Sequence, residues 1–161
     1  VNQFSLSHPE RVGQLAMRSA VAGRTDTESQ HVQERMRNLE KGDLDTNIEL
    51  ALERWFSPEF RQDHPERVQK RIAELRATSP EGYFQAYRVF VLSDLAEHLS
   101  QIQCETLVMT GEYDPGSNVR MARLMHEIIP TSPLELLPGL RHRVLLESPQ
   151  LIAPRLDSFL R

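Results

Sequence analysis

The sequence predicts an α/β protein whose parallel sheet is interrupted by an all-helical insertion. Three short aliphatic runs, at residues 14–20, 105–111 and 133–139, have the length and composition of buried strands. Helical patterns alternate with the last two runs, an order typical of parallel strands joined by crossover helices. Between the first two strands, residues 25–98 carry helical patterns alone.

The first strand, "QLAMRSA", follows the pentapeptide "HPERV" at residues 8–12, and the same five letters recur at residues 64–68. The sequences diverge beyond the two copies, into a strand after the first and a helix after the second. A proline in the first turn with a glutamate behind it is common at helix starts and turns. We therefore interpret the copies as local start signals and not as an internal repeat.

The helical insertion contains segments in which apolar residues recur every three or four positions, with charged residues between them. This spacing predicts four helices, with the sequences "TESQHVQERMRNLEKG", "DTNIELALERWF", "PERVQKRIAELRAT" and "PEGYFQAYRVFVLSDLAEHL".

Two further helices are predicted after the second and third strands. In "SNVRMARLMHEII", the residues Val119, Leu124, Ile128 and Ile129 fall on one helical face. The chain then ends in the helical pattern "PQLIAPRLDSFLR".

Composition excludes several classes of partner. With 161 residues, 39% of them hydrophobic, the chain can bury a core of ordinary domain size. Lys and Arg number 19 against 23 Asp and Glu, without a basic stripe, so nucleic acid is not an expected partner. No apolar run is long enough for a bilayer, so no membrane partner is expected either. A single cysteine, Cys104, interpreted as a small buried hydrophobe, and the lack of a signal-peptide pattern predict a cytoplasmic protein.

Asp114 and His142 each follow a predicted strand of the parallel sheet. The carboxyl ends of parallel strands meet at one edge of a sheet, where ligands and catalytic groups collect. We therefore expect the two side chains within hydrogen-bond reach of each other. A carboxylate beside a histidine fixes the imidazole tautomer and stabilises the imidazolium that forms when histidine takes a proton. The pair is a candidate for general-base chemistry.

Several segments occur in the order found in α/β-hydrolases, and the sequence is most similar to the 3-oxoadipate enol-lactonase group. These segments are "HPERVGQLAM", "LERWFSPEFRQDHPE", "TSPEGYFQAYRVFVLSDL", "IQCETLVMTGEYD" and "LPGLRHRVLLESP". The chain resembles the C-terminal half of an α/β-hydrolase, with core at 1–24 and 99–161 and an all-helical cap, or lid, at 25–98. By this resemblance Asp114 is the triad acid and His142 the triad base.

The G-x-S-x-G turn that carries the serine nucleophile of the family does not occur in these residues. Because "VNQFSLSHPERV" resembles the helix that leaves this turn, the resemblance places the serine just upstream of Val1. Ser5 and Ser7 then lie on the departing helix and are not the nucleophile. The expected partner is an N-terminal segment of the same hydrolase, either a separate chain or a missing part of this one. Leu140 and Arg141 also replace the small residue that commonly precedes the histidine.

Trp55 has two interpretations: packing within the cap, or, by the resemblance, contact with the substrate. Phe84, Tyr87 and Phe90, at helical spacing, favour cap packing. The remaining histidines share no metal-ligand spacing and are interpreted as surface or capping residues, so no metal is expected. They are His8, His31, His64, His98 and His126.

Three functional hypotheses follow. The first is a carboxylic ester or lactone hydrolase without a cofactor, in which an upstream serine attacks the carbonyl, His142 moves the proton and Asp114 orients His142. The second keeps the fold but acts on another bond, such as a C–C bond or another acyl donor. The third is a non-catalytic helical interaction module. A G-x-S-x-G motif upstream of Val1 would select the first two, and the chain by itself is expected to have an incomplete active site.

Overall fold

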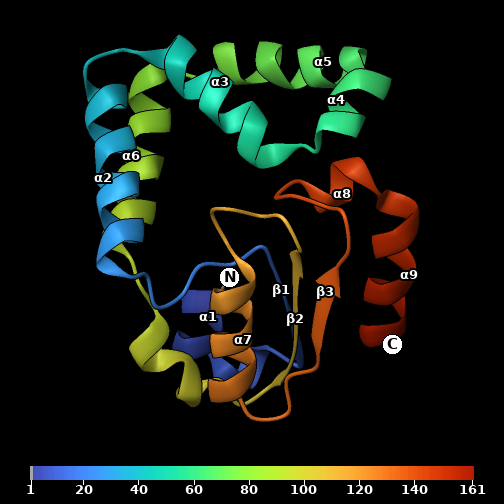
Figure 1. Ribbon diagram of the computed structural model, residues 1–161. Helices are drawn as coiled ribbons and strands as arrows, with labels where there is room; N and C mark the ends of the chain where they lie inside the picture. The colour runs from blue at the N-terminus through green and yellow to red at the C-terminus, as the bar shows by residue number, and fades with distance from the viewer. Residues whose placement is uncertain (1) are drawn as a thin grey trace. The chain divides into compact units, whose positions relative to one another are not determined.

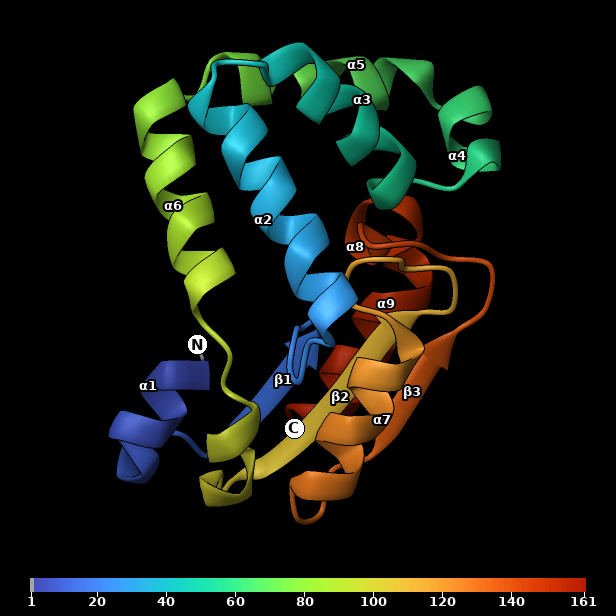
Figure 2. The ribbon, with the colours of Figure 1, turned by 60° about the vertical axis from the view of Figure 1, so that its left-hand side comes forward.

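The computed structural model describes residues 2–161, and the chain divides into two compact units. The sheet unit consists of Val1–Gly23 and Leu95–Arg161, and the helical unit of Arg24–Asp94. Figure 1 and Figure 2 show that every strand lies in the sheet unit and that the inserted unit is built from helices.

The sheet has three parallel strands in the order β1-β2-β3, so β2 is central. The strands are β1 (Gln14–Arg18), β2 (Glu105–Gly111) and β3 (Leu134–Leu137). Their β-branched and aliphatic residues suit a sheet covered on both faces. The predicted strands and their parallel arrangement are confirmed, although β1 and β3 are shorter than predicted.

Helices cover both faces of this sheet, as Figure 1 shows for α7 and α9. One core cluster joins the sheet to α7 (Val119–Ile128), to the 3₁₀ helix η2 (Ala96–Gln101) and to Leu6 of α1 (Asn2–Ser7). A second cluster joins the opposite face to α8 (Val144–Glu147) and α9 (Pro149–Phe159). The helices predicted after β2 and β3 are therefore confirmed, and they lie on opposite faces of the sheet.

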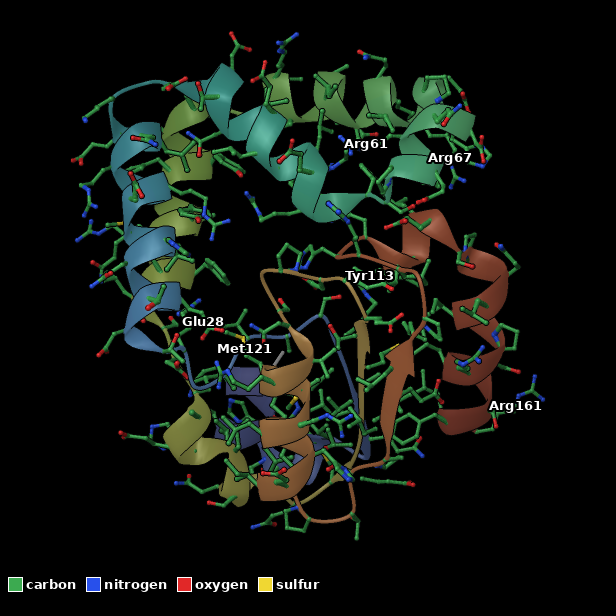
Figure 3. All side chains as sticks on the ribbon, in the orientation of Figure 1. Glu28, Arg61, Arg67, Tyr113, Met121 and Arg161 are labelled. Atoms are coloured by element: carbon green, nitrogen blue, oxygen red, sulfur yellow. The ribbon has the colours of Figure 1, made fainter. Side chains whose placement is uncertain are left out.

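The buried face of α7 differs from the predicted one. Met121, Ala122 and Met125 are buried against the sheet, and Met121 is labelled in Figure 3. Of the four residues predicted to share the apolar face, only Ile129 is buried, just after the helix ends, while Val119, Leu124 and Ile128 are half-buried. Asn118 starts the helix by accepting a hydrogen bond from the backbone N–H of Met121. Methionines therefore form much of the stripe that faces the core, whereas the predicted face consisted of valine, leucine and isoleucine residues.

The helical unit consists of α2 (Asp26–Glu40), α3 (Leu44–Trp55), α4 (Pro58–Asp63), α5 (Pro65–Arg76) and α6 (Pro80–Leu92). Within the described residues of 25–98 there is no strand, which confirms the all-helical prediction. Helices α2 and α6 lie side by side (Figure 1, Figure 2). Helices α3, α4 and α5 share an apolar core of Ile48, Ala51, Trp55, Phe56, Phe60, Val68 and Leu75.

Two details of the helical segment differ from the prediction. Helix α4 was missed, although Ser57 caps it through the backbone N–H of Phe60 and Pro58 occupies its first turn. The helix predicted from Pro80 to Leu99 ends at Leu92, because Ser93 is extended and its hydroxyl turns back to the Val89 carbonyl. The separate helix η2 follows.

Both copies of "HPERV" begin helices, the short 3₁₀ helix η1 (Pro9–Arg11) and α5, which supports their interpretation as local start signals. Cys104, just before β2, is half-buried and free, and it packs beside the sheet core. None of the helices formed by the described residues has the length and apolar character needed to cross a bilayer.

Ile152 tests the contribution of α9 to the fold, because its side chain is fully buried against the sheet. We expect Ile152→Ala to lower the free energy of unfolding by about 2–5 kcal/mol and the matched Ile152→Val by about 0.5–1.5 kcal/mol. Urea unfolding curves measure both. Equal small losses would show that α9 does not depend on this contact.

Candidate active site

Asp114 and His142 come together at the carboxyl edge of the sheet. Asp114 lies in the loop after β2, and His142 lies in the loop after β3. The imidazole Nδ1 is 2.8 Å from the carboxylate Oδ2 of Asp114. This distance confirms the prediction that the two side chains are within hydrogen-bond reach.

The Asp114 carboxylate is buried, and each of its oxygens accepts hydrogen bonds. Oδ1 accepts the backbone N–H groups of Gly116 and Ser117, both at 2.9 Å, while Oδ2 accepts from His142. Burial by itself raises the pKa of Asp114. The hydrogen bond and charge of His142, together with the two backbone donors, lower it by more than burial raises it, so the pKa lies below its ordinary value. Asp114 is therefore an ionised acceptor at neutral pH.

The His142 side chain is 30% exposed, whereas the Asp114 side chain is fully buried. Because an ionised carboxylate only accepts hydrogen bonds, the Nδ1 atom of neutral His142 carries the proton and donates it to Asp114. The lone pair of neutral His142 is then on Nε2, which makes that atom the proton acceptor. Among the described residues, no serine, threonine or cysteine hydrogen-bonds Nε2.

Ser5 and Ser7 lie on α1, as the sequence predicts. Ser5 is buried in this helix, and the Ser7 hydroxyl accepts a hydrogen bond from the Gln3 amide. Neither lies on a turn between a strand and a helix.

Gly111, at the end of β2, allows the histidine loop to approach the sheet closely. A Cβ atom at this position would lie 2.3 Å from the Arg141 carbonyl oxygen and 2.5 Å from that of Leu140. The Tyr113 N–H donates to the Leu140 carbonyl at 3.0 Å, on the loop labelled at Tyr113 in Figure 3. The backbone of Leu140 and Arg141 therefore packs directly against Gly111. Sequence reasoning missed Gly111, although a glycine at the end of a strand can signal such an approach.

Two carboxylates hold the backbone of the same loop. Gly139, whose φ of 72° is in the left-handed region, donates its N–H to Glu112 Oε2 at 3.1 Å. The Arg141 N–H donates to Glu147 Oε1 at 3.3 Å, and Glu147 is buried on α8. The loop before His142 is thus fixed at both ends.

Trp55 belongs to the helical unit, where it is only 7% exposed. Its ring meets the edge of Phe56, and the Arg71 guanidinium lies 5.5 Å from its centre. This burial supports the packing interpretation of Trp55, and contact with a substrate stays a prediction. Tyr87 and Phe90 also pack together on α6, with their ring centres 5.6 Å apart.

The remaining histidines are all exposed, in agreement with their interpretation as surface residues. His8 and His64 occupy N-cap positions, although neither side chain makes a capping hydrogen bond. In the part of the chain that the structure describes, no three His, Cys, Asp or Glu residues are placed to hold a metal ion.

Two curated relatives resemble nearly the whole chain. The sequence is 31% identical to the (E)-2-((N-methylformamido)methylene)succinate hydrolase of Acinetobacter baylyi over 159 residues, which is 97% of this chain and 59% of that protein. It is also 31% identical to 3-oxoadipate enol-lactonase 2 of the same organism over 147 residues, covering 91% of this chain and 54% of the lactonase. The chain therefore spans a little over half the length of these relatives. No family model matches it.

The crystal structure of the enol-lactonase from Burkholderia xenovorans superposes with a TM-score of 0.89 at 18% identity, over 98% of this chain and 59% of that one. The protein thus has the fold of the C-terminal part of an α/β-hydrolase, with an inserted helical segment. Within that class its sequence resembles the 3-oxoadipate enol-lactonase group.

The close approach at Gly111 leads to a stability prediction. We expect Gly111→Ala to lower the free energy of unfolding by about 1–3 kcal/mol, because the new methyl group overlaps two carbonyl oxygens that cannot both move away. Gly13→Ala is the matched control, since a Cβ there meets no atom within 4 Å. Denaturant unfolding compares them. Equal stabilities for the two variants would contradict the seating of the histidine loop on Gly111.

The lowered pKa of Asp114 leads to a prediction about pH. A carboxyl group whose pKa is lower in the folded than in the unfolded protein stabilises the fold above the unfolded value and loses this contribution as pH falls through the folded value. The stability advantage of the wild type over Asp114→Asn should therefore be full above about pH 5 and shrink below about pH 4. Unfolding free energies measured at several pH values test this. A difference that does not change with pH would contradict it.

Proposed function

We propose that the protein hydrolyses a carboxylic ester or a lactone, with Asp114 and His142 as the acid and base of a Ser–Asp–His triad. The observation that carries the proposal is the 2.8 Å contact between His142 Nδ1 and the buried Asp114 carboxylate at the carboxyl edge of the sheet. The serine belongs to an N-terminal segment of the same hydrolase, outside these residues. The sequence similarity to a hydrolase and an enol-lactonase supports this assignment.

In this mechanism His142 moves protons through Nε2. The serine oxygen attacks the carbonyl carbon while Nε2 takes the hydroxyl proton, and Asp114 stabilises the resulting imidazolium. The imidazolium then gives the proton to the leaving oxygen as the C–O bond breaks, which leaves an acyl-enzyme. A water molecule, deprotonated by His142, attacks this ester, and the imidazolium returns the proton to the serine oxygen as the C–O bond to serine breaks and the acid leaves. The cycle uses no cofactor.

The helical segment 25–98 is proposed as a lid over the substrate, with Trp55 as a candidate contact. The half-buried, free Cys104 is compatible with a reducing, cytoplasmic setting for the enzyme.

A second candidate reaction is the hydrolysis of another acyl donor on the same triad. The name of one relative favours it, because an (N-methylformamido)methylene succinate contains an amide and no ester. The two candidates share the roles of Asp114 and His142 and differ in the leaving group.

Expression of residues 1–161, alone and together with the N-terminal segment, tests the proposal. We expect no esterase activity from residues 1–161 alone, because serine attack and oxyanion stabilisation supply most of the rate enhancement. The combined protein should hydrolyse a nitrophenyl acetate, and His142→Ala should lower kcat by at least about a thousandfold.

His126→Ala is the matched control, since His126 is exposed on α7. It should keep the activity of the combined protein. Full activity of residues 1–161 alone, or of the His142→Ala variant, would overturn the proposed triad. A parallel assay with a lactone and an N-formyl amide separates the two candidate reactions.

A further inference from the structure

The backbone carbonyl of His142 receives two hydrogen bonds from the end of β1. The Ser19 hydroxyl donates to this oxygen at 3.1 Å, and Nη1 of Arg18 lies 3.4 Å from it. Strand β1 is not the strand that carries His142 or Asp114, and it pairs with β2. The histidine is therefore held by its side chain from the β2 loop and by its main chain from β1.

The backbone at Ser19 is unusual for its residue type. Its φ is 48°, in the left-handed region where residues other than glycine are uncommon. The Ser19 N–H nevertheless continues the sheet ladder by donating to the Met109 carbonyl at 2.9 Å. Strained conformations of this kind persist where surrounding contacts impose them, and they cluster at functional sites. Here the residue with this conformation is the one whose hydroxyl donates to the His142 carbonyl.

Arg18 is half-buried and makes no ion pair with a carboxylate among the described residues. Burial lowers the pKa of its guanidinium, and the nearby Asp114 charge partly offsets this effect. The guanidinium stays charged, because the ordinary pKa of arginine is far above neutrality. Its guanidinium instead hydrogen-bonds the His142 carbonyl. A partly buried arginine whose guanidinium binds a main-chain oxygen beside the acid–base pair indicates that its role is to hold the backbone there.

We propose that Arg18 and Ser19 are positioning residues that fix the backbone of His142 so that its Nε2 atom points at the reacting centre. The proposal rests on the function proposed above, in which His142 is the base. One hydrogen bond from Nδ1 to Asp114 fixes the ring at one atom, and the contacts described for the preceding loop hold the backbone before His142 but not His142 itself. The two donors to the carbonyl fix the chain beside the Cα atom. Together the contacts define the direction of Nε2.

Displacement of a catalytic group by about 1 Å can reduce the rate about a hundredfold. Loss of the carbonyl anchor should therefore lower kcat while leaving KM nearly unchanged, because neither residue is proposed to bind substrate. Removal of a substrate contact would instead raise KM. This division separates positioning from binding.

The test uses two substitutions that remove one donor each. Ser19→Gly removes the hydroxyl and suits the left-handed backbone, so its effect is not caused by added strain. Arg18→Met removes the guanidinium and keeps a long side chain. In the combined active protein, we expect the double variant to lose about 10- to 100-fold in kcat with KM within about twofold. When Arg18→Lys replaces Arg18→Met in the double variant, the cationic donor is kept, so part of the lost kcat should return.

A spectroscopic measurement on the combined protein gives a readout that does not need activity. The Nδ1 proton of His142, held by Asp114, should exchange with water about tenfold faster in the double variant, as measured by NMR. The matched control is Arg123→Met, because Arg123 is exposed on α7. It should leave the exchange unchanged. Faster exchange of the Nδ1 proton in the Arg18 and Ser19 variants, with backbone amide exchange in the sheet unchanged, supports the proposal.

Unchanged kcat and unchanged exchange in the double variant would overturn this inference and leave the triad intact. Full activity of His142→Ala would overturn the proposed function itself. A rise in KM with constant kcat would show that Arg18 binds substrate, which also contradicts a positioning role.

Discussion

Strand β2 pairs in parallel with both of its neighbours, and this double pairing decides where the polar groups of the candidate site lie. The residues that follow β1, β2 and β3 emerge at one edge because parallel strands point in one direction. Ser19, Asp114 and His142 are far apart in sequence, and the sheet brings them together. The strand itself is almost entirely buried from Thr106 to Gly111, so helices on both faces must hold it in place.

A buried negative charge at that edge makes further demands on the structure. An isolated carboxylate in a dry interior is strongly unfavourable, and it stays ionised only when donors compensate for the lost water. Asp114 has such donors in His142 and in the N–H groups of Gly116 and Ser117. One of these donors, His142, comes from the loop after β3. The position of that loop therefore determines how well the Asp114 charge is stabilised, as well as where the proposed base lies. The glycine at position 111 and the carboxylates that hold the loop backbone are parts of the same arrangement.

Much of the fold could be predicted from the sequence, because it depends on periodicity within short segments. Aliphatic runs located the three strands, and three- and four-residue spacing located most helices. The errors occurred where one side chain changes the local backbone. Ser57 starts a short helix, and the Ser93 hydroxyl ends a longer one. The face of α7 was misjudged because methionines fill its core stripe.

The site was predicted only in part, for a different physical reason. Asp114 and His142 could be found because a motif at the end of a strand predicts the edge of the sheet at which a side chain emerges. The anchors could not be found in this way. Arg18 and Ser19 act on the main chain of a loop that follows another strand, and nothing in their neighbouring residues encodes that contact. Glu147 is close to the loop in sequence, but its contact with the Arg141 N–H depends on how the chain turns between them.

The arrangement of these anchors also constrains any nucleophile that His142 serves. Nδ1 is committed to Asp114, and the carbonyl is committed to β1, so Nε2 is the atom of the imidazole left for proton transfer. A serine that uses this base must place its oxygen about 2.6–3.2 Å from Nε2, close to the in-plane direction of the lone pair. Because the ring is held through two neighbouring strands, a small shift of the serine cannot be corrected by the histidine. Under the proposed function, the segment that supplies the serine must therefore pack against this edge as closely as residues pack in a protein core. The sheet unit holds His142 in place, and the packing of that segment places the serine oxygen.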